Sequence, residues 1–224
     1  MELTKEQLLQ IDNYIFVCGI KFYDVRTEIV DHFANILEQK LDENPNLNFK
    51  QEIRTIHRDF SDSGFSKLLK EKTKSVEKRF YKQSLQHLIT FFKLPKIIIT
   101  TALFYVLFLV MNFIDDKDSF FAVLSLILFF LAFRLLFNVN MRNSKKDTFL
   151  ALNMTLNFFN LFYFFVMMFD MLSRRRGAES DLNTTYNNIE LVVFVMLLLF
   201  YWSGEFVFYQ HKKVVKEQYP NVIV

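Results

Sequence analysis

Four long apolar runs dominate the second half of the chain. Short polar segments separate them, and the uninterrupted core of each run holds no charge or a single one. About 20 apolar residues in a helix span the roughly 30 Å hydrocarbon core of a bilayer, and a helix satisfies its own backbone hydrogen bonds there. The pattern therefore predicts four transmembrane helices. Their expected ranges are about 97–114, 120–137, 148–172 and 189–208.

The first 70 residues show a different pattern, in which short amphipathic stretches alternate with polar breaks. Thr4 opens a capping-box sequence, and Gly19 follows the last apolar position of that stretch. Asp24 is a good N-cap residue for a second helix, and Asn48 is one for a third. Residues 1–70 are therefore predicted to form a small helical domain on the cytoplasmic side of the membrane.

A sharp change of charge follows this domain. Residues 1–66 hold 7 Lys and Arg against 12 Asp and Glu, whereas residues 67–96 hold 9 against 2. A fourth helix is expected to begin near Ser66, and residues 71–96 to form a basic connector beside the membrane. Anionic lipid headgroups attract such a segment, but the favoured interpretation is ordinary positive-inside charge without a regulatory role. Aromatic residues are sparse in the segment, so nucleic acid is not an expected partner.

The orientation in the membrane follows from Lys and Arg in the short flanks, because cytoplasmic loops retain positive charge during insertion. With the N-terminus inside, the inner flanks hold 11 of these residues and the outer loops hold 4. Three of the four residues in the outer loops are Arg174, Arg175 and Arg176. Their positive charge does not fit an outer loop, so the side of the membrane on which this loop lies stays open. The distribution predicts a multi-pass protein of the inner (plasma) membrane with both termini, including the tail 209–224, in the cytoplasm.

The composition supports an all-α integral membrane protein and excludes several activities. Phe occurs 29 times against 4 Gly and 3 Pro, a balance that suits long helices. Gly204 is the only glycine in the apolar runs, so we expect the spans to pack through Phe, Leu and Met. The single Cys excludes an intrachain disulfide and a cysteine-based zinc cluster. Phosphate-binding loops and hydrolase motifs do not occur, so we expect neither enzymatic activity nor a cofactor or metal.

Polar residues within the apolar runs form the first candidate site, because a charge at mid-membrane costs at least ~2.5 kcal/mol and usually has a partner. Arg134 and Glu205 are expected at matching depth near the inner side. Asn153, Asn157 and Asn160 share one helical face, which we expect to point into the bundle. The favoured interpretation is an ion pair and hydrogen bonds that fix the packing. The alternative is a polar pocket for a solute, an ion or a lipid headgroup.

The histidines of the front domain form a second candidate site. His32 stands beside Asp31 in the second predicted helix, and His57 lies in the third. The three side chains could meet across the small bundle as a proton switch, a weak metal site or an interaction surface. The plainer interpretation places them at the surface.

The stretch Asp24-Val25-Arg26-Thr27-Glu28-Ile29-Val30-Asp31-His32, followed by Phe33 and a Gly64-Phe65 turn, resembles the HAAS-type or permease-prefix helical domain. The resemblance covers about the front third of the chain. It implies a short cytoplasmic helical domain that precedes membrane helices and acts in signalling or regulation through protein contacts.

These observations favour a membrane-anchored signalling or regulatory protein whose cytoplasmic domain contacts a protein partner. A homo-oligomer is also consistent with the Phe-rich packing of the spans. A small transporter or channel, or an accessory subunit of one, is the second hypothesis, and its support is the asparagine face. A membrane-embedded enzyme ranks third, because the runs lack clustered His, Asp or Ser.

Overall fold

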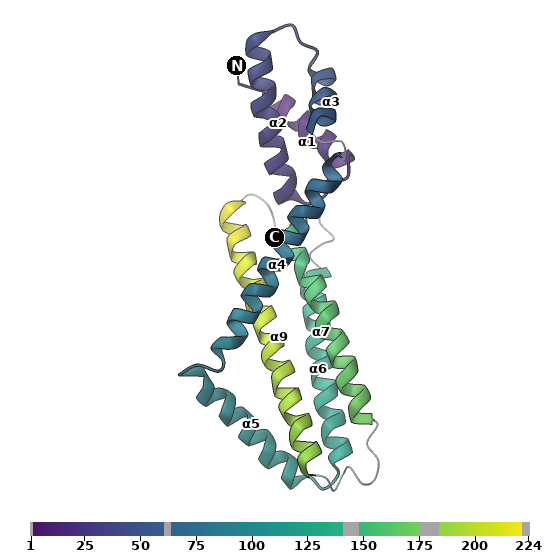
Figure 1. The fold of residues 1–224 in the computed structure, drawn as a ribbon, viewed down its shortest axis with the longest axis vertical. Helices are drawn as coiled ribbons and strands as arrows, with labels where there is room; N and C mark the ends of the chain where they lie inside the picture. Colours follow the sequence, from purple (N-terminus) through teal and green to yellow (C-terminus); the bar gives the residue numbers. More distant parts are fainter. Residues whose placement is uncertain (1, 61–63, 141–147, 175–183, 221–224) are drawn as a thin grey trace. The chain divides into compact units, whose positions relative to one another are not determined.

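The structure, a computed structural model, describes residues 2–60, 64–140, 148–174 and 184–220. Within these ranges the fold is all-α, with helices at the N-terminus followed by four long apolar helices (Figure 1). The helices are α1 (Lys5–Val17), α2 (Tyr23–Glu43), α3 (Phe49–Phe60), α4 (Gly64–Thr90), α5 (Lys96–Phe113), α6 (Lys117–Asn140), α7 (Leu150–Arg174) and α9 (Thr184–Gln218).

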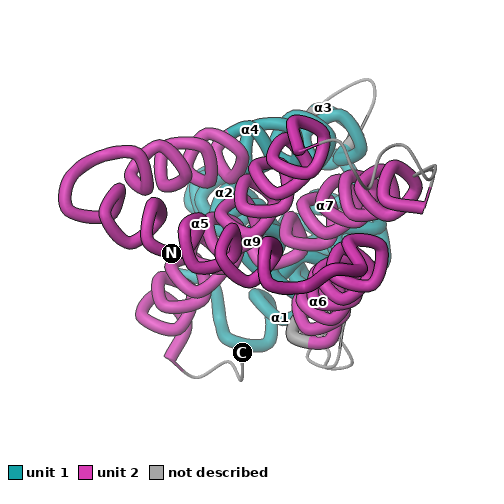
Figure 2. Tube along the Cα trace, turned by 90° about the horizontal axis from the view of Figure 1, so that it is seen from below, with its two compact units in different colours: residues 1–78, 145–151, 221–223 teal, residues 79–144, 152–220, 224 magenta. Residues whose placement is uncertain are grey.

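The chain divides into two compact units (Figure 2). We call residues 1–78 together with 145–151 the front unit, and residues 79–144 together with 152–220 the apolar unit. Two helices, α4 and α7, run continuously from one unit into the other. The boundary predicted at residue 70 therefore falls within α4, and the first residues of α7 belong to the front unit.

The front unit packs α1, α2 and α3 around a core that includes Ile11, Ile15, Phe33 and Leu37, each at most 1% exposed. Thr4 forms the predicted capping box, since its hydroxyl accepts from the backbone of Gln7 and the Gln7 side chain accepts from the backbone of Thr4. Gly19 has φ +102°, a value that glycine adopts without strain. Asn48 accepts a hydrogen bond from the Gln51 backbone at 3.2 Å and so starts α3 as predicted.

The apolar unit contains the four predicted candidate spans, α5, α6, α7 and α9, each long and apolar enough to cross a membrane. These helices imply contact with a lipid bilayer, as in a multi-pass membrane protein. Rings of α7 pack on α9, as in Phe162 against Tyr201 at 5.5 Å between centroids. In Figure 1, α5 leans away from the other helices along most of its length. Most of its side chains are accordingly exposed, several are half-buried, and among its residues only Met111 is buried.

Packing between α7 and α9 depends on Gly204. The fully buried ring of Phe158 lies where a side chain at residue 204 would stand, so a methyl group there would overlap the ring. The spans do pack through Phe as expected, and the lone glycine admits an aromatic ring from the neighbouring helix rather than a close backbone crossing.

Candidate functional site

The start of α7 is held by the first turn of α2, within the front unit. The Tyr23 backbone N–H donates to the Thr148 carbonyl at 2.8 Å, and residues 22 and 148 form a parallel bridge. The carboxylate of Asp24 then accepts from the backbone N–H groups of Leu150 at 3.0 Å and Ala151 at 3.5 Å. The first backbone N–H groups of a helix have no partner within the helix, so Asp24 caps α7 from another helix.

This arrangement corrects the prediction that Asp24 caps α2. The N-cap of α2 is Phe22, which makes no side-chain cap, and Asp24 lies in the first turn of the helix. The carboxylate still accepts from the Val25 N–H at 3.1 Å, while its other contacts reach a segment about 126 residues further along the chain. An aspartate before an amphipathic stretch usually indicates that it caps the helix that follows. Nothing in the sequence around Asp24 indicates that it caps α7 instead.

Apolar contacts enclose the polar ones at this junction. Phe149 and Leu150 are 2% and 1% exposed, and the Phe149 ring packs on Tyr23 at 5.6 Å between centroids. Burial raises the pKa of Asp24, and the N–H donors of Leu150, Ala151 and Val25 oppose that rise. The helix N-terminus favours the charged carboxylate as well, because the helix dipole is positive there.

An ion pair between the buried Arg26 and the half-buried Asp12 ties the same turn of α2 to α1. The Arg26 guanidinium is 5% exposed, and its Nε donates to Asp12 at 2.6 Å. The Phe16 and Tyr23 rings lie 5.3 and 5.4 Å from the guanidinium carbon, in the range of cation–π contacts. Arg26 is not among the candidate residues predicted from the sequence. Its position on the apolar face of α2, beside Val25 and Ile29, was the available signal.

The three side chains proposed as a histidine site are not gathered together. Asp31 and His32 are exposed on α2, as the plainer interpretation predicts for His32. His57 is half-buried, its Nδ1 lies 2.8 Å from the Tyr14 hydroxyl, and its ring stacks on Phe65 at 4.2 Å. His57 thus contacts Tyr14 and Phe65, while His32 is exposed, in agreement with the favoured interpretation of surface or boundary positions. In the described part of the chain, no group of three or more His, Cys, Asp or Glu side chains could hold a metal ion.

Burial raises the pKa of Tyr14, and the nearby Cys18 adds to the rise. The Cys18 thiol is exposed and lies 3.9 Å from the same histidine nitrogen. The phenol therefore stays protonated at neutral pH and acts here as a structural hydrogen-bonding group.

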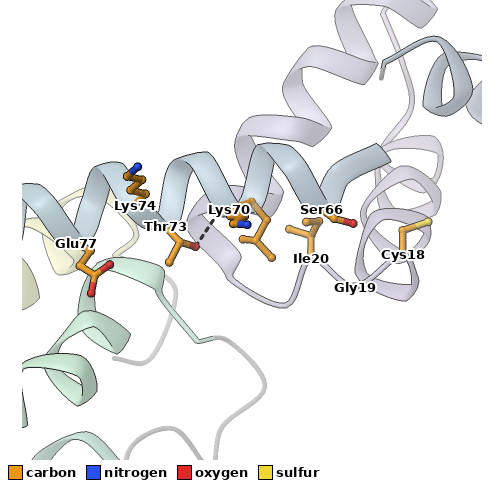
Figure 3. A pocket seen from close by; sticks show the side chains of 9 residues that line it. Cys18, Gly19, Ile20, Ser66, Lys70, Thr73, Lys74 and Glu77 are labelled. Atoms are coloured by element: carbon orange, nitrogen blue, oxygen red, sulfur yellow. Dashed lines mark hydrogen bonds between the residues drawn. The ribbon is translucent and has the colours of Figure 1, made fainter. Parts of the chain in front are cut away.

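A groove of about 690 Å³ runs between the end of α1 and the first half of α4 (Figure 3). Cys18, Gly19 and Ile20 line it from the side of α1. The lining residues from α4 are Ser66, Leu69, Lys70, Thr73, Lys74 and Glu77. The Thr73 hydroxyl donates to the Leu69 carbonyl at 2.7 Å, so this hydroxyl serves the helix itself.

Arg134 and Glu205 form the predicted ion pair, with 2.8 Å between Nη2 and Oε1. The arginine side chain is 50% exposed and the glutamate side chain 13% exposed. The Tyr201 ring is fully buried on α9, one helical turn before Glu205. The pair joins α6 to α9, in agreement with the structural interpretation of these two charges.

The asparagine face of α7 does not point into the bundle as expected. Asn160 is exposed, whereas Asn153 and Asn157 are half-buried, with Asn157 Nδ2 at 3.9 Å from the Met154 sulfur. The buried face of α7 is formed by neighbouring large residues instead, because apolar rings fill the space beside α9 better than amides. The members of that face are Met154, Thr155, Phe158, Phe162, Val166 and Phe169.

The opposite end of α7 carries polar contacts made by Asp170 and by Ser173. Asp170 accepts from the Ser125 hydroxyl and from Arg174 Nε, both at 2.8 Å, so its predicted closeness to Arg174 is confirmed. The Ser173 hydroxyl donates to the carboxylate of Glu190, and both residues are buried. The contact between Ser173 and Glu190 is not among the predicted ones, although a glutamate at the start of an apolar run was a usable signal. Arg175 and Arg176 lie outside the described residues.

Comparisons with protein families, with curated proteins and with solved structures find no match to this chain. The resemblance to the HAAS-type domain therefore stays a prediction.

Proposed function

We propose that the protein is a membrane-anchored regulatory protein whose N-terminal helical domain binds a protein partner and passes the bound state on to the candidate span α7. The observation that carries this proposal is the cap that Asp24 provides to Leu150 and Ala151. A partner that moved the first turn of α2 would weaken or strengthen the hydrogen bonds that Asp24 accepts from the N-terminus of α7. No further contact is needed for this coupling, because α7 continues into the apolar unit.

The proposed location is the inner (plasma) membrane, with both termini in the cytoplasm. The excess of Lys and Arg in the inner flanks supports this orientation. The basic connector would then lie beside the cytoplasmic leaflet, whose anionic lipids attract positive charge.

The surface of the front unit offers contacts for a protein. Leu9 and Val17 of α1 are 60% and 83% exposed, so both apolar side chains are accessible to a protein partner. Asp31 and His32 are exposed on α2. Residues 1–66 carry more acidic than basic side chains, so a partner with a basic rim around an apolar patch fits this surface best.

The test is affinity capture of the full-length protein from native membranes, read by mass spectrometry. The variant Leu9→Ser/Val17→Ser is compared with Gln10→Ser/Lys21→Ser, which also alters two exposed positions of the front unit. We expect one protein to be captured by the native chain and by the control pair. Its capture should fall at least about tenfold with the first pair, the loss expected for about 1.4 kcal/mol of binding free energy.

An identical set of captured proteins for all three chains would contradict the proposal. A copy without residues 1–70 extends the test, because a partner that is still retained by this copy would bind the membrane helices instead. The orientation of Asn160 gives the transporter hypothesis no support.

A further inference from the structure

A second groove, of about 600 Å³, lies between α6 and α7 within the apolar unit. The two helices run antiparallel here, because Ser125 bonds to Asp170 while the Phe129 ring lies 6.2 Å from the Tyr163 ring. The start of α6 and the end of α7 therefore meet at one end of the bundle (Figure 1). The lining includes polar residues at this end and apolar residues further along α6, namely Asp118, Asp170 and Arg174, and then Ala122, Leu126 and Phe129.

The α6 wall of this groove has the length of one bilayer leaflet. Its residues share one face of the helix, because they follow one another at spacings of three or four positions. The eleven residue steps from Asp118 to Phe129 correspond to about 16 Å of helix, and half of the hydrocarbon core is about 15 Å thick. Ala122 is small and exposed, so it leaves space beside Leu126, which is 67% exposed. One acyl chain of a lipid matches this wall in length and in polarity.

Two carboxylates and one guanidinium form the polar end of the groove. Asp118 is exposed in the first turn of α6. Asp170 accepts hydrogen bonds from Ser125 and Arg174, and a carboxylate has acceptor positions for more than two donors. The Arg174 side chain is 78% exposed, so a phosphate can reach its guanidinium. The Lys117 ammonium donates instead to carbonyl groups at the end of α5. The polar end thus offers acceptors for an ammonium group beside donors for a phosphate.

We propose that the groove between α6 and α7 binds a phospholipid whose headgroup carries a primary ammonium group, as in phosphatidylethanolamine. The ammonium donates to the two carboxylates, the Arg174 guanidinium binds the phosphate, and one acyl chain lies along the apolar wall of α6. Phosphatidylcholine carries the same charges, but its trimethylammonium has no N–H to donate. Phosphatidylglycerol has no cationic group. The inference rests on the crossing of the membrane by α6 and α7, and it is independent of the protein partner.

Native mass spectrometry of the purified full chain tests the proposal. The chain is incubated with an equimolar mixture of phosphatidylethanolamine, phosphatidylcholine and phosphatidylglycerol that carry the same acyl chains. We expect the native chain to retain phosphatidylethanolamine at least about threefold more than phosphatidylcholine, because only the former donates hydrogen bonds to the carboxylates. Equal retention of these two lipids would overturn the proposal, but it would leave the capture of a protein by the front unit unaffected.

Two substitutions, each with a matched control, locate the bound lipid. Asp118→Asn should reduce the preference for phosphatidylethanolamine and increase the retention of phosphatidylglycerol, a gain that a misfolded variant would not show. Asp115→Asn, at an exposed position just before α6, should keep the native preference. Ala122→Leu should lower lipid retention because its larger side chain enters the groove, whereas Ala102→Leu, at an exposed position of α5, should not. The same result for a substitution and its control would place the lipid elsewhere and overturn the proposal.

Ethanolamine phosphate, the free headgroup, distinguishes a lipid from a soluble ligand. A large molar excess should leave the bound phosphatidylethanolamine in place, because the acyl chain along α6 contributes to the binding of the lipid alone. Displacement of the lipid by the free headgroup would overturn the proposal in favour of a small soluble amine.

Discussion

Asp24 illustrates how one side chain connects parts of the chain that are far apart in sequence. Its carboxylate lies in the first turn of α2 and accepts from the backbone at the start of α7. Loss of an N-cap side chain typically costs about 1 kcal/mol. At this position the loss of free energy would destabilise the N-terminus of α7 as well as the front unit. Asp24 is therefore the most direct residue at which to test the proposed coupling of α2 to α7.

Asp24→Ala should weaken the α7 N-terminus and leave α1 and α3 intact, because it removes the acceptor of the Leu150 and Ala151 N–H groups. Hydrogen exchange followed by mass spectrometry should show faster exchange in the peptide that begins α7. Asp24→Asn keeps one acceptor oxygen and should fall between Ala and the native residue. Unchanged exchange in Asp24→Ala would mean that the cap does not hold α7.

The raised pKa of Asp24 predicts a pH dependence. The folded protein holds this proton more tightly than the unfolded chain, whose reference pKa is 3.8. Between that value and the higher folded pKa, the folded state binds more protons, so stability falls as pH rises through this window. Thermal unfolding in detergent should show this slope in the native chain and a flatter one in Asp24→Asn. Asp31→Asn, at an exposed position, serves as the control and should keep the native slope.

The packing of α7 on α9 depends on the shapes of the two helix surfaces at Gly204 and Phe158. Gly204 leaves the space that the Phe158 ring occupies, and the ring is fully buried. A helix surface with one notch and one matching ring fixes the register of two helices that otherwise present similar apolar surfaces. Charged side chains add contacts between the helices, as in Arg134 with Glu205 and in Glu190 with the Ser173 hydroxyl.

Gly204→Ala should therefore destabilise the protein by about 1–3 kcal/mol through overpacking. Unfolding by a graded increase of denaturing detergent, followed by circular dichroism, gives the measurement. Phe158→Leu in the same chain should restore part of the loss, since the smaller side chain makes room for the methyl group. Strictly additive effects of the two substitutions would contradict the proposed notch.

The whole molecule is expected to cross the membrane four times with both termini on the cytoplasmic side. Cys18 is the single cysteine of the chain and is exposed in the front unit. A membrane-impermeant thiol reagent should therefore label it in inverted vesicles and not in intact cells. Cys18→Ser/Asp115→Cys moves the thiol to the loop between α5 and α6 and should reverse the pattern. Labelling of Cys18 in intact cells would place the front unit outside.

Much of this fold could be predicted because its causes are local in the sequence. The four apolar runs define candidate spans, since bilayer thickness sets a length that any chain must match. Thr4 and Asn48 start their helices because a capping side chain bonds within three residues. Arg134 meets Glu205 because two charges at equal depth in apolar helices have few other partners.

The remaining features were decided by tertiary structure. The sequence around Asp24 indicates a cap of its own helix, but in the fold Asp24 accepts from the first N–H groups of α7. The asparagines of α7 share a face by spacing alone, but packing of Phe158 into the notch at Gly204 turns that face toward the edge of the bundle. Periodicity states which residues share a face of a helix. The shapes of the neighbouring helices decide which face is buried, because burial depends on how well two surfaces fit.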